Sequence, residues 1–410
     1  MNRGRFGLAI AIQAIMWGVT QPIAGAVADR FGAARVIVFG AVTYGIGIGI
    51  LATADGAIGL LSFGFVTGIA AGSASFAVIL ASVGRMASPE RRSMALGIIT
   101  AMGSVGQFFL IPLARVLLDR NDWRVVLIVF AAIAAAIMLF ARPIRGNAAD
   151  QERMPSAEGL RPLRDDLARA SRSTNYLMLN AAFFVCGFHV TYIATHLPAY
   201  VGDLGIAASA AAWALALIGL FNVFGSLGAG WLGSRIAPTK ILAGIYGARA
   251  VVIVVYLLVP TSATSTVIFG AAIGVLWLST VPGTSAIVAT MFGTANAGAL
   301  FGIVFLSHQA GAFVGAWMGG VLADASGSYD VAWWTAVALA VFASAIHLFI
   351  DGSPEPDGPV IRTGRRSLAP GFGVVAIVAF GLVALTVTTR ASTADAAAAD
   401  RPAFICVIGG

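Results

Sequence analysis

The chain has 410 residues, of which 59% are hydrophobic and only 10% are charged, and it carries a formal net charge of +7 at pH 7. A soluble domain normally carries about 25% charged residues, so this composition excludes water as the main solvent and places most of the chain in lipid. The Lys and Arg side chains lie mostly between the apolar runs, where they indicate membrane topology rather than a nucleic-acid partner.

Apolar segments recur along the whole chain at a length that suits membrane helices, which need about 20 mostly apolar residues. The sequence therefore predicts an all-α membrane protein. Twelve segments qualify: 6–28, 36–53, 57–84, 94–118, 124–141, 176–201, 208–234, 241–259, 264–290, 296–323, 330–350 and 371–389.

One long polar linker, residues 142–175 with seven Arg, divides the chain. We expect an N-terminal membrane half at 1–141, a C-terminal membrane half at 176–350, and a tail at 351–410 in which 371–389 could be an additional span. If the linker is cytoplasmic, 17 Lys and Arg lie on its side of the membrane and seven on the other, with Arg249 inside a span. This bias predicts a multi-pass protein of the cell's inner (plasma) membrane with a cytoplasmic linker.

Two short stretches repeat across the halves. The stretch GAVADRFG at 25–32 and the stretch GWLGSRIA at 230–237 each begin with Gly and carry Arg five residues later, and each follows one span and precedes another. Repeated halves joined by a cytoplasmic loop are typical of secondary transporters, whose substrate site lies between the halves near the bilayer midplane.

The first copy, with Gly25, Asp29, Arg30, Gly32 and Arg35, resembles the G-x-x-x-D-R-x-G signature of the major facilitator superfamily. That resemblance implies a bundle of two pseudo-symmetric helical halves, in which the signature joins helices two and three and latches the outward-open state. Gly25 would allow close helix approach, and Asp29 could meet a helix N-terminus and a neighbouring Arg.

Arg85, at the cytoplasmic end of segment 57–84, is the candidate partner of Asp29, so the predicted gating residues are Gly25, Asp29, Arg30 and Arg85. The stretches at 106–124, 186–201 and 298–334 resemble bacterial carriers of the monocarboxylate and oxalate/formate type. The resemblance covers residues 6–350.

By the superfamily count, segment 6–28 is helix two, so the resemblance implies that the first helix is absent from this chain. The half at 1–141 would then hold helices two to six and the half at 176–350 helices seven to twelve, which makes about 11 family helices, with 371–389 as an extra C-terminal span. Because helices one, four, seven and ten line the cavity in the superfamily, we expect an incomplete cavity wall.

Strongly polar side chains within spans are costly in lipid and are therefore candidates for function. His308, followed by Gln309, lies about 11 residues from the cytoplasmic end of its span, or roughly 17 Å deep at 1.5 Å per residue. His189, Tyr192 and His196 share one face of segment 176–201 because they are spaced at i, i+3 and i+7. We expect His308, Gln309, His189 and Tyr192 to contact the substrate, although each His could instead be bonded within the helix bundle.

Segment 208–234 contains no charged residue, whereas the resemblance implies a basic residue on this helix that holds the substrate carboxylate. Asn222 is the candidate there, and Gln107 and Trp277 are weaker candidates on other spans. Arg249 is the one charge deep in an apolar run, and it is either an anion-binding group or a brace between helices. The sequence indicates no catalytic residue, no metal site and no cofactor.

These observations together predict secondary active transport of a small, monocarboxylate-like organic anion by alternating access, as symport or antiport. No Asp or Glu lies in the interior of an expected span, so proton coupling would need His titration or a proton carried by the substrate. Two alternatives stay open: efflux of drug-like or neutral organic solutes by the same fold, and a truncated membrane protein that does not transport. An enzyme is not expected, because Walker, G-x-S-x-G and HExxH arrangements are absent. The expected partners are the bilayer and the solute, and the chain is expected to be a monomer.

Overall fold

The structure is a computed structural model that describes residues 3–53, 56–140 and 162–354, and within these ranges every regular element is a helix. The helices are α1 (Arg3–Phe31), α2 (Ala33–Thr53), α3 (Ala57–Ser73), α4 (Phe76–Met86), α5 (Pro89–Arg120), α6 (Trp123–Phe140), α8 (Leu163–Ala170), α9 (Thr174–Asp203), α10 (Ala208–Leu232), α11 (Pro238–Leu258), α12 (Ala263–Val275), α13 (Thr280–Phe292), α14 (Ala297–Ser326) and α15 (Asp330–Phe349).

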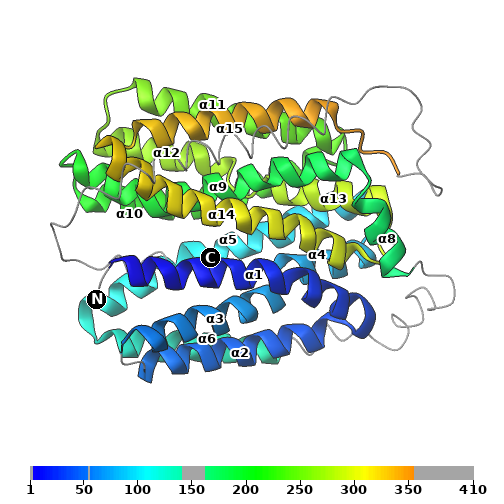
Figure 1. Ribbon diagram of the computed structural model, residues 1–410, viewed down its shortest axis with the longest axis horizontal. Helices are drawn as coiled ribbons and strands as arrows, with labels where there is room; N and C mark the ends of the chain where they lie inside the picture. The colour runs from blue at the N-terminus through cyan, green and yellow to red at the C-terminus, as the bar shows by residue number, and fades with distance from the viewer. Residues whose placement is uncertain (1–2, 54–55, 141–161, 355–410) are drawn as a thin grey trace.

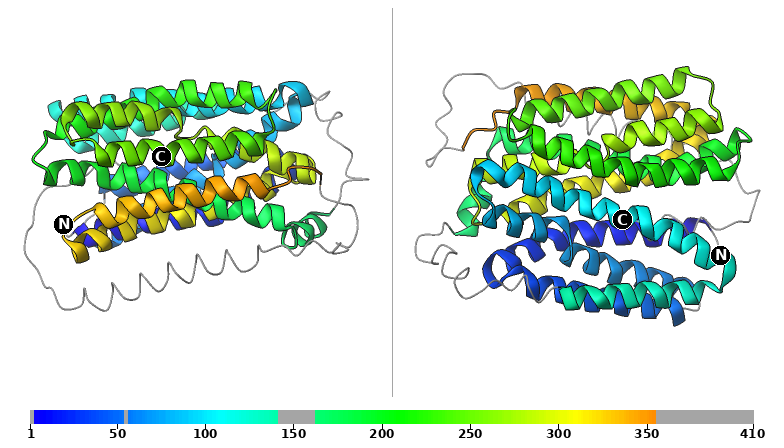
Figure 2. Two further views of the ribbon diagram at one scale, coloured as in Figure 1. Left: turned by 90° about the horizontal axis from the view of Figure 1, so that it is seen from above. Right: turned by 180° about the vertical axis from the view of Figure 1, so that it is seen from behind.

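The helices form two layers, one from each half of the chain (Figure 1). The blue and cyan helices α1–α6 make the lower layer of Figure 1, and the green to orange helices α9–α15 make the upper one. Two helix pairs make the largest contacts between the layers, α1 with α14 and α5 with α10, and smaller contacts join α4 to α14 and α5 to α13. Helix α9 packs on α14 within the upper layer. The same two layers are seen from behind in Figure 2.

The two halves are repeats with a constant spacing. Adding 205 to the bounds of α2, 33–53, gives the bounds of α11, 238–258. The same offset carries α1 to α10, α3 and α4 to α12 and α13, α5 to α14, and α6 to α15, within four residues at every boundary. It also places Gly25 onto Gly230 and Asp29 onto Ser234, so the repeat seen in two short stretches extends through α1–α6, while α9 has no equivalent among the described helices of the N-terminal half.

The expected spans from 6–28 to 330–350 all correspond to helices, and the segment 371–389 lies outside the described residues. By length and hydropathy, nine helical segments of the described chain are suited to cross a membrane, when α3 is joined with α4 and α12 with α13. This architecture is the expected all-α membrane bundle.

Two expected continuous spans are broken in the middle. Segment 57–84 is interrupted at Ala74 and Ser75, between α3 and α4, and segment 264–290 is interrupted at residues 276–279, between α12 and α13. A hydropathy pattern does not register such a break, because the side chains on both sides of it are equally apolar. The breaks lie at equivalent places in the two repeats.

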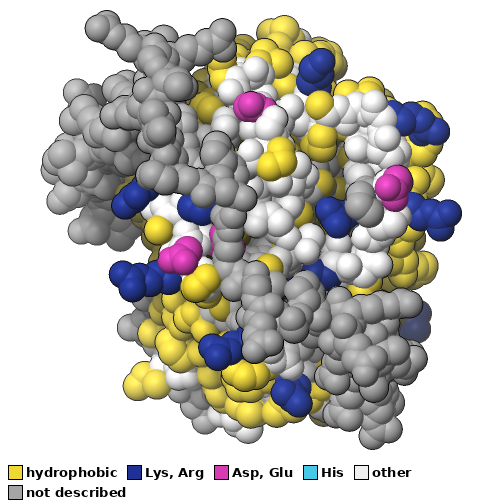
Figure 3. Space-filling view, turned by 90° about the vertical axis from the view of Figure 1, so that its right-hand side faces the viewer, with side chains coloured by type: hydrophobic (Ala, Val, Ile, Leu, Met, Phe, Trp, Pro, Cys, Tyr) yellow, Lys and Arg dark blue, Asp and Glu magenta, His cyan; other side chains and the backbone are white. Residues whose placement is uncertain are grey.

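One end of the bundle carries α8, which belongs to the expected linker, at the right of Figure 1. Figure 3 looks onto this end, where Lys and Arg side chains are spread over the surface and Asp and Glu are few. This is the distribution that the positive-inside rule gives to a cytoplasmic face, and we call it the linker end.

Candidate functional site

The two halves approach each other most closely where α1 crosses α14 near the linker end. A Cβ atom added at Gly25 would lie 2.2 Å from the carbonyl oxygen of Gly298, and one added at Gly302 would lie 2.6 Å from the Cα of Pro22. Only glycine permits this backbone contact. The sequence folds this way because small residues on α1 and α14 face each other at the crossing.

Asp29 joins the halves at the same crossing. Its side chain is 5% exposed, and Arg85 from the end of α4 donates a hydrogen bond to its Oδ1. Its Oδ2 accepts from the backbone N–H of Ala299, 3.0 Å away, in the first turn of α14. The carboxylate therefore satisfies an orphan amide of a helix in the other half, where the helix dipole also favours a negative charge. The remaining predicted gating residue, Arg30, is exposed and lies over the ring of Phe31.

The second crossing, of α5 with α10, is related to the first by the repeat but lacks the charge. A Cβ at Gly97 would lie 2.7 Å from the carbonyl oxygen of Ser226 and 2.9 Å from the Cα of Gly230. At the position equivalent to Asp29, Ser234 lies in the turn after α10 and donates to the carbonyl of Trp231 in the last turn of that helix. The linker end is thus closed by glycine contacts at both crossings and, at the α1–α14 crossing, by the hydrogen bond from the Ala299 N–H to Asp29, which Arg85 of the same half holds in place. The gating role of these residues stays a prediction.

Deeper in the membrane, the α1–α14 crossing carries a cluster of polar side chains, which we call the α1–α14 cluster: Trp17, Gln21, His308 and Gln309. A Cβ at Gly18 would lie 2.9 Å from the Cβ of Gln309, so this part of α1 rests on Gln309. Nδ1 of His308 is 3.2 Å from Oε1 of Gln309. Trp17, Gln21 and Gln309 lie where the two halves meet, and the His308 ring lies on the α9 side of α14, with its centroid 5.1 Å from that of Phe183.

Several polar atoms of the α1–α14 cluster are buried and have no hydrogen-bond partner among the described residues. They are Nε1 of Trp17, both amide atoms of Gln21 and Nε2 of His308. Aromatic rings enclose them, because Trp17 stacks on Phe305 at 6.1 Å and His308 lies 4.7 Å from the same ring. Buried polar groups are normally paired, so this concentration of unpaired donors and acceptors at one crossing marks it as a candidate ligand site.

The α5–α10 crossing carries a polar contact at the equivalent depth. Asn222 is fully buried, and its Nδ2 donates to Oγ of Ser104 on α5 at 2.5 Å. Its Oδ1 accepts from the backbone N–H of Leu278 at 2.8 Å, inside the break between α12 and α13. By the 205 offset, Asn222 corresponds to Trp17 and Ser104 to Gln309. The structure thus brings together two equivalent pairs, one at each crossing, although Ser104 did not stand out in the sequence.

Arg249 lies beside the break between α12 and α13, with only 1% of its surface exposed. Its Nε donates to the carbonyl oxygen of Leu276 at 3.1 Å, and its Nη2 donates to the carbonyls of Leu276, at 2.6 Å, and Trp277. Its Nη1 is buried without a partner among the described residues, and the guanidinium lies 5.1 Å from the Tyr246 ring centroid. Arg249 therefore stabilises backbone carbonyls that the helix break leaves without helical partners, and its Nη1 group remains available to donate.

Cys186 of α9 also lies at this place, which its isolated position in the sequence did not indicate. Its thiol is 3.2 Å from Oγ1 of Thr280 and 3.7 Å from Nη2 of Arg249. The neighbouring Gly187 packs so tightly on α14 that a Cβ there would lie 1.8 Å from the carbonyl oxygen of His308. Arg249 and His308 therefore contact adjacent positions of α9.

The other predicted site residues lie elsewhere. His189 of α9 is bonded through Nε2 to the carbonyl of Ala336 on α15 at 2.8 Å, and Tyr192 is buried against Trp333 of α15. Trp277 is buried in the core of the C-terminal half. None of these three side chains is among those that meet α1 or α5. The side chain of Gln107 lies outside the described residues.

Comparison with known sequences identifies relatives along most of the chain. The sequence model of the Major Facilitator Superfamily matches residues 1–280. Monocarboxylate transporter 13 of Bos taurus is 23% identical over 343 residues, which cover 82% of this chain and 78% of that protein. The MFS-type transporter YhjX of Escherichia coli is 25% identical over 304 residues, with 72% and 73% covered.

Solved structures share the fold. The fucose:proton symporter FucP of E. coli superposes with a TM-score of 0.67 at 16% identity, covering 85% of this chain and 91% of that one. The human organic anion transporter MFSD10 superposes with a TM-score of 0.58 at 18% identity, covering 84% and 82%.

Proposed function

Because this chain belongs to the major facilitator superfamily, and is therefore a multi-pass integral membrane transporter of small solutes, we propose that it carries a small organic anion of the monocarboxylate class. The relatives named monocarboxylate transporters support this substrate class. The proposed site lies between the α1–α14 cluster and the pair formed by Asn222 and Ser104, near the bilayer midplane, as is usual for transporters built from repeats.

The observation that carries the proposal is the buried pair His308 and Gln309, of which Gln309 lies against α1 and His308 packs on Phe305, the ring on which Trp17 stacks. An imidazole, a primary amide and an indole N–H can all donate hydrogen bonds to a carboxylate. The positive charge of Arg249 lies on the other side of α9, and no carboxylate of the described chain pairs with it. An uncompensated cation in a low-dielectric region favours an anionic ligand.

Alternating access follows from the same contacts. With α1 on α14 and α5 on α10, the linker end is closed and Asp29 holds the first turn of α14. Parting these helix pairs would expose the polar side chains at both crossings to the linker side. The substrate would then replace bonds that the halves lose when they separate, which couples binding to the conformational change.

A second candidate is efflux of neutral organic solutes by the same movement. The observation in its favour is the uncharged character of α10, whose side chain at the crossing is the amide of Asn222. A site with only amide, hydroxyl and aromatic groups around a solute would not require a carboxylate.

Uptake into proteoliposomes tests the proposal. Radiolabelled pyruvate and lactate should enter vesicles that contain the purified chain, and uptake should change with an imposed pH gradient. His308→Gln should lower uptake about 10-fold or more, because a hydrogen bond to a charged group contributes about 1.5–3 kcal/mol. The matched control is His347→Gln, because His347 is equally buried but bonds to the Ala343 carbonyl within α15.

The outcomes separate the two candidates. Uptake that persists undiminished in His308→Gln would remove His308 from the site. Vesicles that take up neither monocarboxylate but expel a neutral fluorescent dye would contradict the anion proposal and favour the second candidate.

A further inference from the structure

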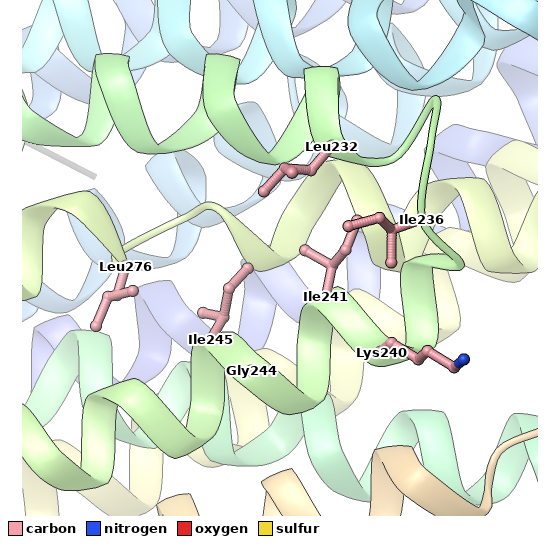
Figure 4. Close-up of a pocket in the computed structure, with 7 residues that line it drawn as sticks. All are labelled: Leu232, Ile236, Lys240, Ile241, Gly244, Ile245 and Leu276. Carbon is pink, nitrogen blue, oxygen red and sulfur yellow. The ribbon is translucent and has the colours of Figure 1, made fainter.

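An apolar groove opens on the outer face of the C-terminal half, away from both crossings (Figure 4). It has a volume of about 290 Å³ and lies between the end of α10, the first half of α11 and the end of α12. Its lining residues are Leu232, Ile236, Lys240, Ile241, Gly244, Ile245 and Leu276. Figure 4 shows Lys240 at one end of the groove and Leu276 at the opposite end.

The floor of the groove is open because α11 has glycine at position 244. A Cβ added there would meet no atom within 4 Å, and the residue is exposed. The 205 offset assigns Gly244 to Phe39 of α2, an aromatic residue that is 56% exposed. The N-terminal half therefore places a large apolar side chain at the position where the C-terminal half leaves space.

The mouth of the groove is positively charged. Lys240 is exposed in the first turn of α11, and Arg235 is exposed in the turn that precedes this helix, its guanidinium 3.8 Å from the ring centroid of Trp231. Asp351 lines a separate hollow beside Thr239 and is not among the residues of the groove. Hydrogen bonds from Ser353 hold the pKa of Asp351 below its usual range and occupy its carboxylate.

We propose that this groove binds an anionic phospholipid of the leaflet on the linker side. One acyl chain lies over Gly244 between Ile241 and Ile245 and reaches Leu276, and the phosphate meets Lys240 and Arg235. An apolar slot that faces lipid and ends at basic side chains in the headgroup region has the chemistry of such a lipid. The end of the acyl chain would touch Leu276, whose carbonyl oxygen accepts a hydrogen bond from Arg249. The lipid would therefore lie against the break between α12 and α13.

The test is native mass spectrometry of the purified full chain in dodecylmaltoside, titrated with dioleoylphosphatidylglycerol or dioleoylphosphatidylcholine. The wild-type chain should retain phosphatidylglycerol preferentially. Lys240→Ala should weaken this binding about five-fold, as expected for one basic residue at a lipid headgroup. Gly244→Phe, which copies the N-terminal repeat, should abolish the tight binding of both lipids because it fills the slot.

Arg35→Ala is the matched control, since Arg35 is the equivalent of Lys240 in the N-terminal half and lies beside Phe39 rather than a glycine. Its binding should equal that of the wild type. Equal losses of lipid binding in Arg35→Ala and Lys240→Ala would show nonspecific attraction of the lipid to basic residues. Undiminished lipid binding in Gly244→Phe would exclude the groove as the binding site. Either result overturns the proposal. Displacement of the lipid by inorganic phosphate alone would also overturn it in favour of a simple anion site. Unfolding temperatures in lipid-free detergent show that each variant is folded.

Discussion

The closest contact between the halves, at Gly25, gives a quantitative prediction for Gly25→Ala. The added Cβ would lie 2.2 Å from the carbonyl oxygen and 2.4 Å from the carbonyl carbon of Gly298, whereas ordinary contact begins at 3.4 Å. Both atoms are backbone and cannot rotate away, so α1 and α14 must separate by about 1 Å. Overpacking of this kind costs about 1–3 kcal/mol. Since the strain exists only while the crossing is closed, the closed state should lose roughly 5- to 150-fold in population.

The assay is maleimide labelling of a reporter at the linker end. Ala299→Cys places a thiol at the buried α1–α14 crossing, in a chain whose Cys406 is replaced by Ser. Cys186 is fully buried and sets the background. Gly25→Ala should raise the labelling rate of the reporter in proportion to the shift in population. Gly45→Ala is the control, because a Cβ at Gly45 meets no atom within 4 Å. An unchanged rate in Gly25→Ala with normal folding would refute the view that this contact closes the linker end.

Two further predictions concern bracing contacts of the C-terminal half. Asp166 of α8 is buried and accepts a hydrogen bond of 2.8 Å from Nδ2 of Asn296, which directly precedes α14. Asp166→Asn should lower the thermal unfolding midpoint, because it removes about 1.5–3 kcal/mol of stabilisation. Asp165→Asn, at the exposed neighbouring position, should leave the midpoint unchanged, and equal effects of the two variants would contradict a docking role for Asp166. In Arg249→Lys, the ammonium cannot reproduce the planar guanidinium contact with two carbonyls. This variant should therefore also lower the unfolding midpoint, through a loss of about 1–3 kcal/mol of stabilisation. Loss of anion uptake at an unchanged midpoint would instead assign Arg249 to substrate binding.

The positions of the helices could be predicted from the sequence, and the likeness of the Asp29 region to the superfamily signature could be recognised there, because both depend on local patterns. Runs of apolar residues fix the helices, and the spacing of Gly25, Asp29 and Arg30 is readable directly. That Asp29 would bond to the N-terminus of some helix could also be expected, because helix N-termini favour negative charge. Which helix supplies that amide came only from the structure, since 270 residues separate Asp29 from Ala299.

The breaks and the polar pairs could not be predicted, because their energetics depend on side chains from distant helices. The break at residues 276–279 leaves backbone groups unpaired, and Asn222 and Arg249 satisfy them from α10 and α11. No pattern within 264–290 reveals those partners. Ser104 is similar: one hydroxyl among many becomes notable only when Asn222 is seen to bond to it across the halves.

The unequal crossings at the linker end have a mechanical consequence. Once Asp29 releases the amide of Ala299, only glycine contacts hold that end of α1 to α14, whereas the bond from Asn222 to Ser104 still ties α10 to α5. If one half rotates on the other, we therefore expect the axis to lie nearer to α5 and α10 than to the centre of the bundle. The linker end would then open most widely beside α1 and least beside α5 and α10, rather than evenly on both sides.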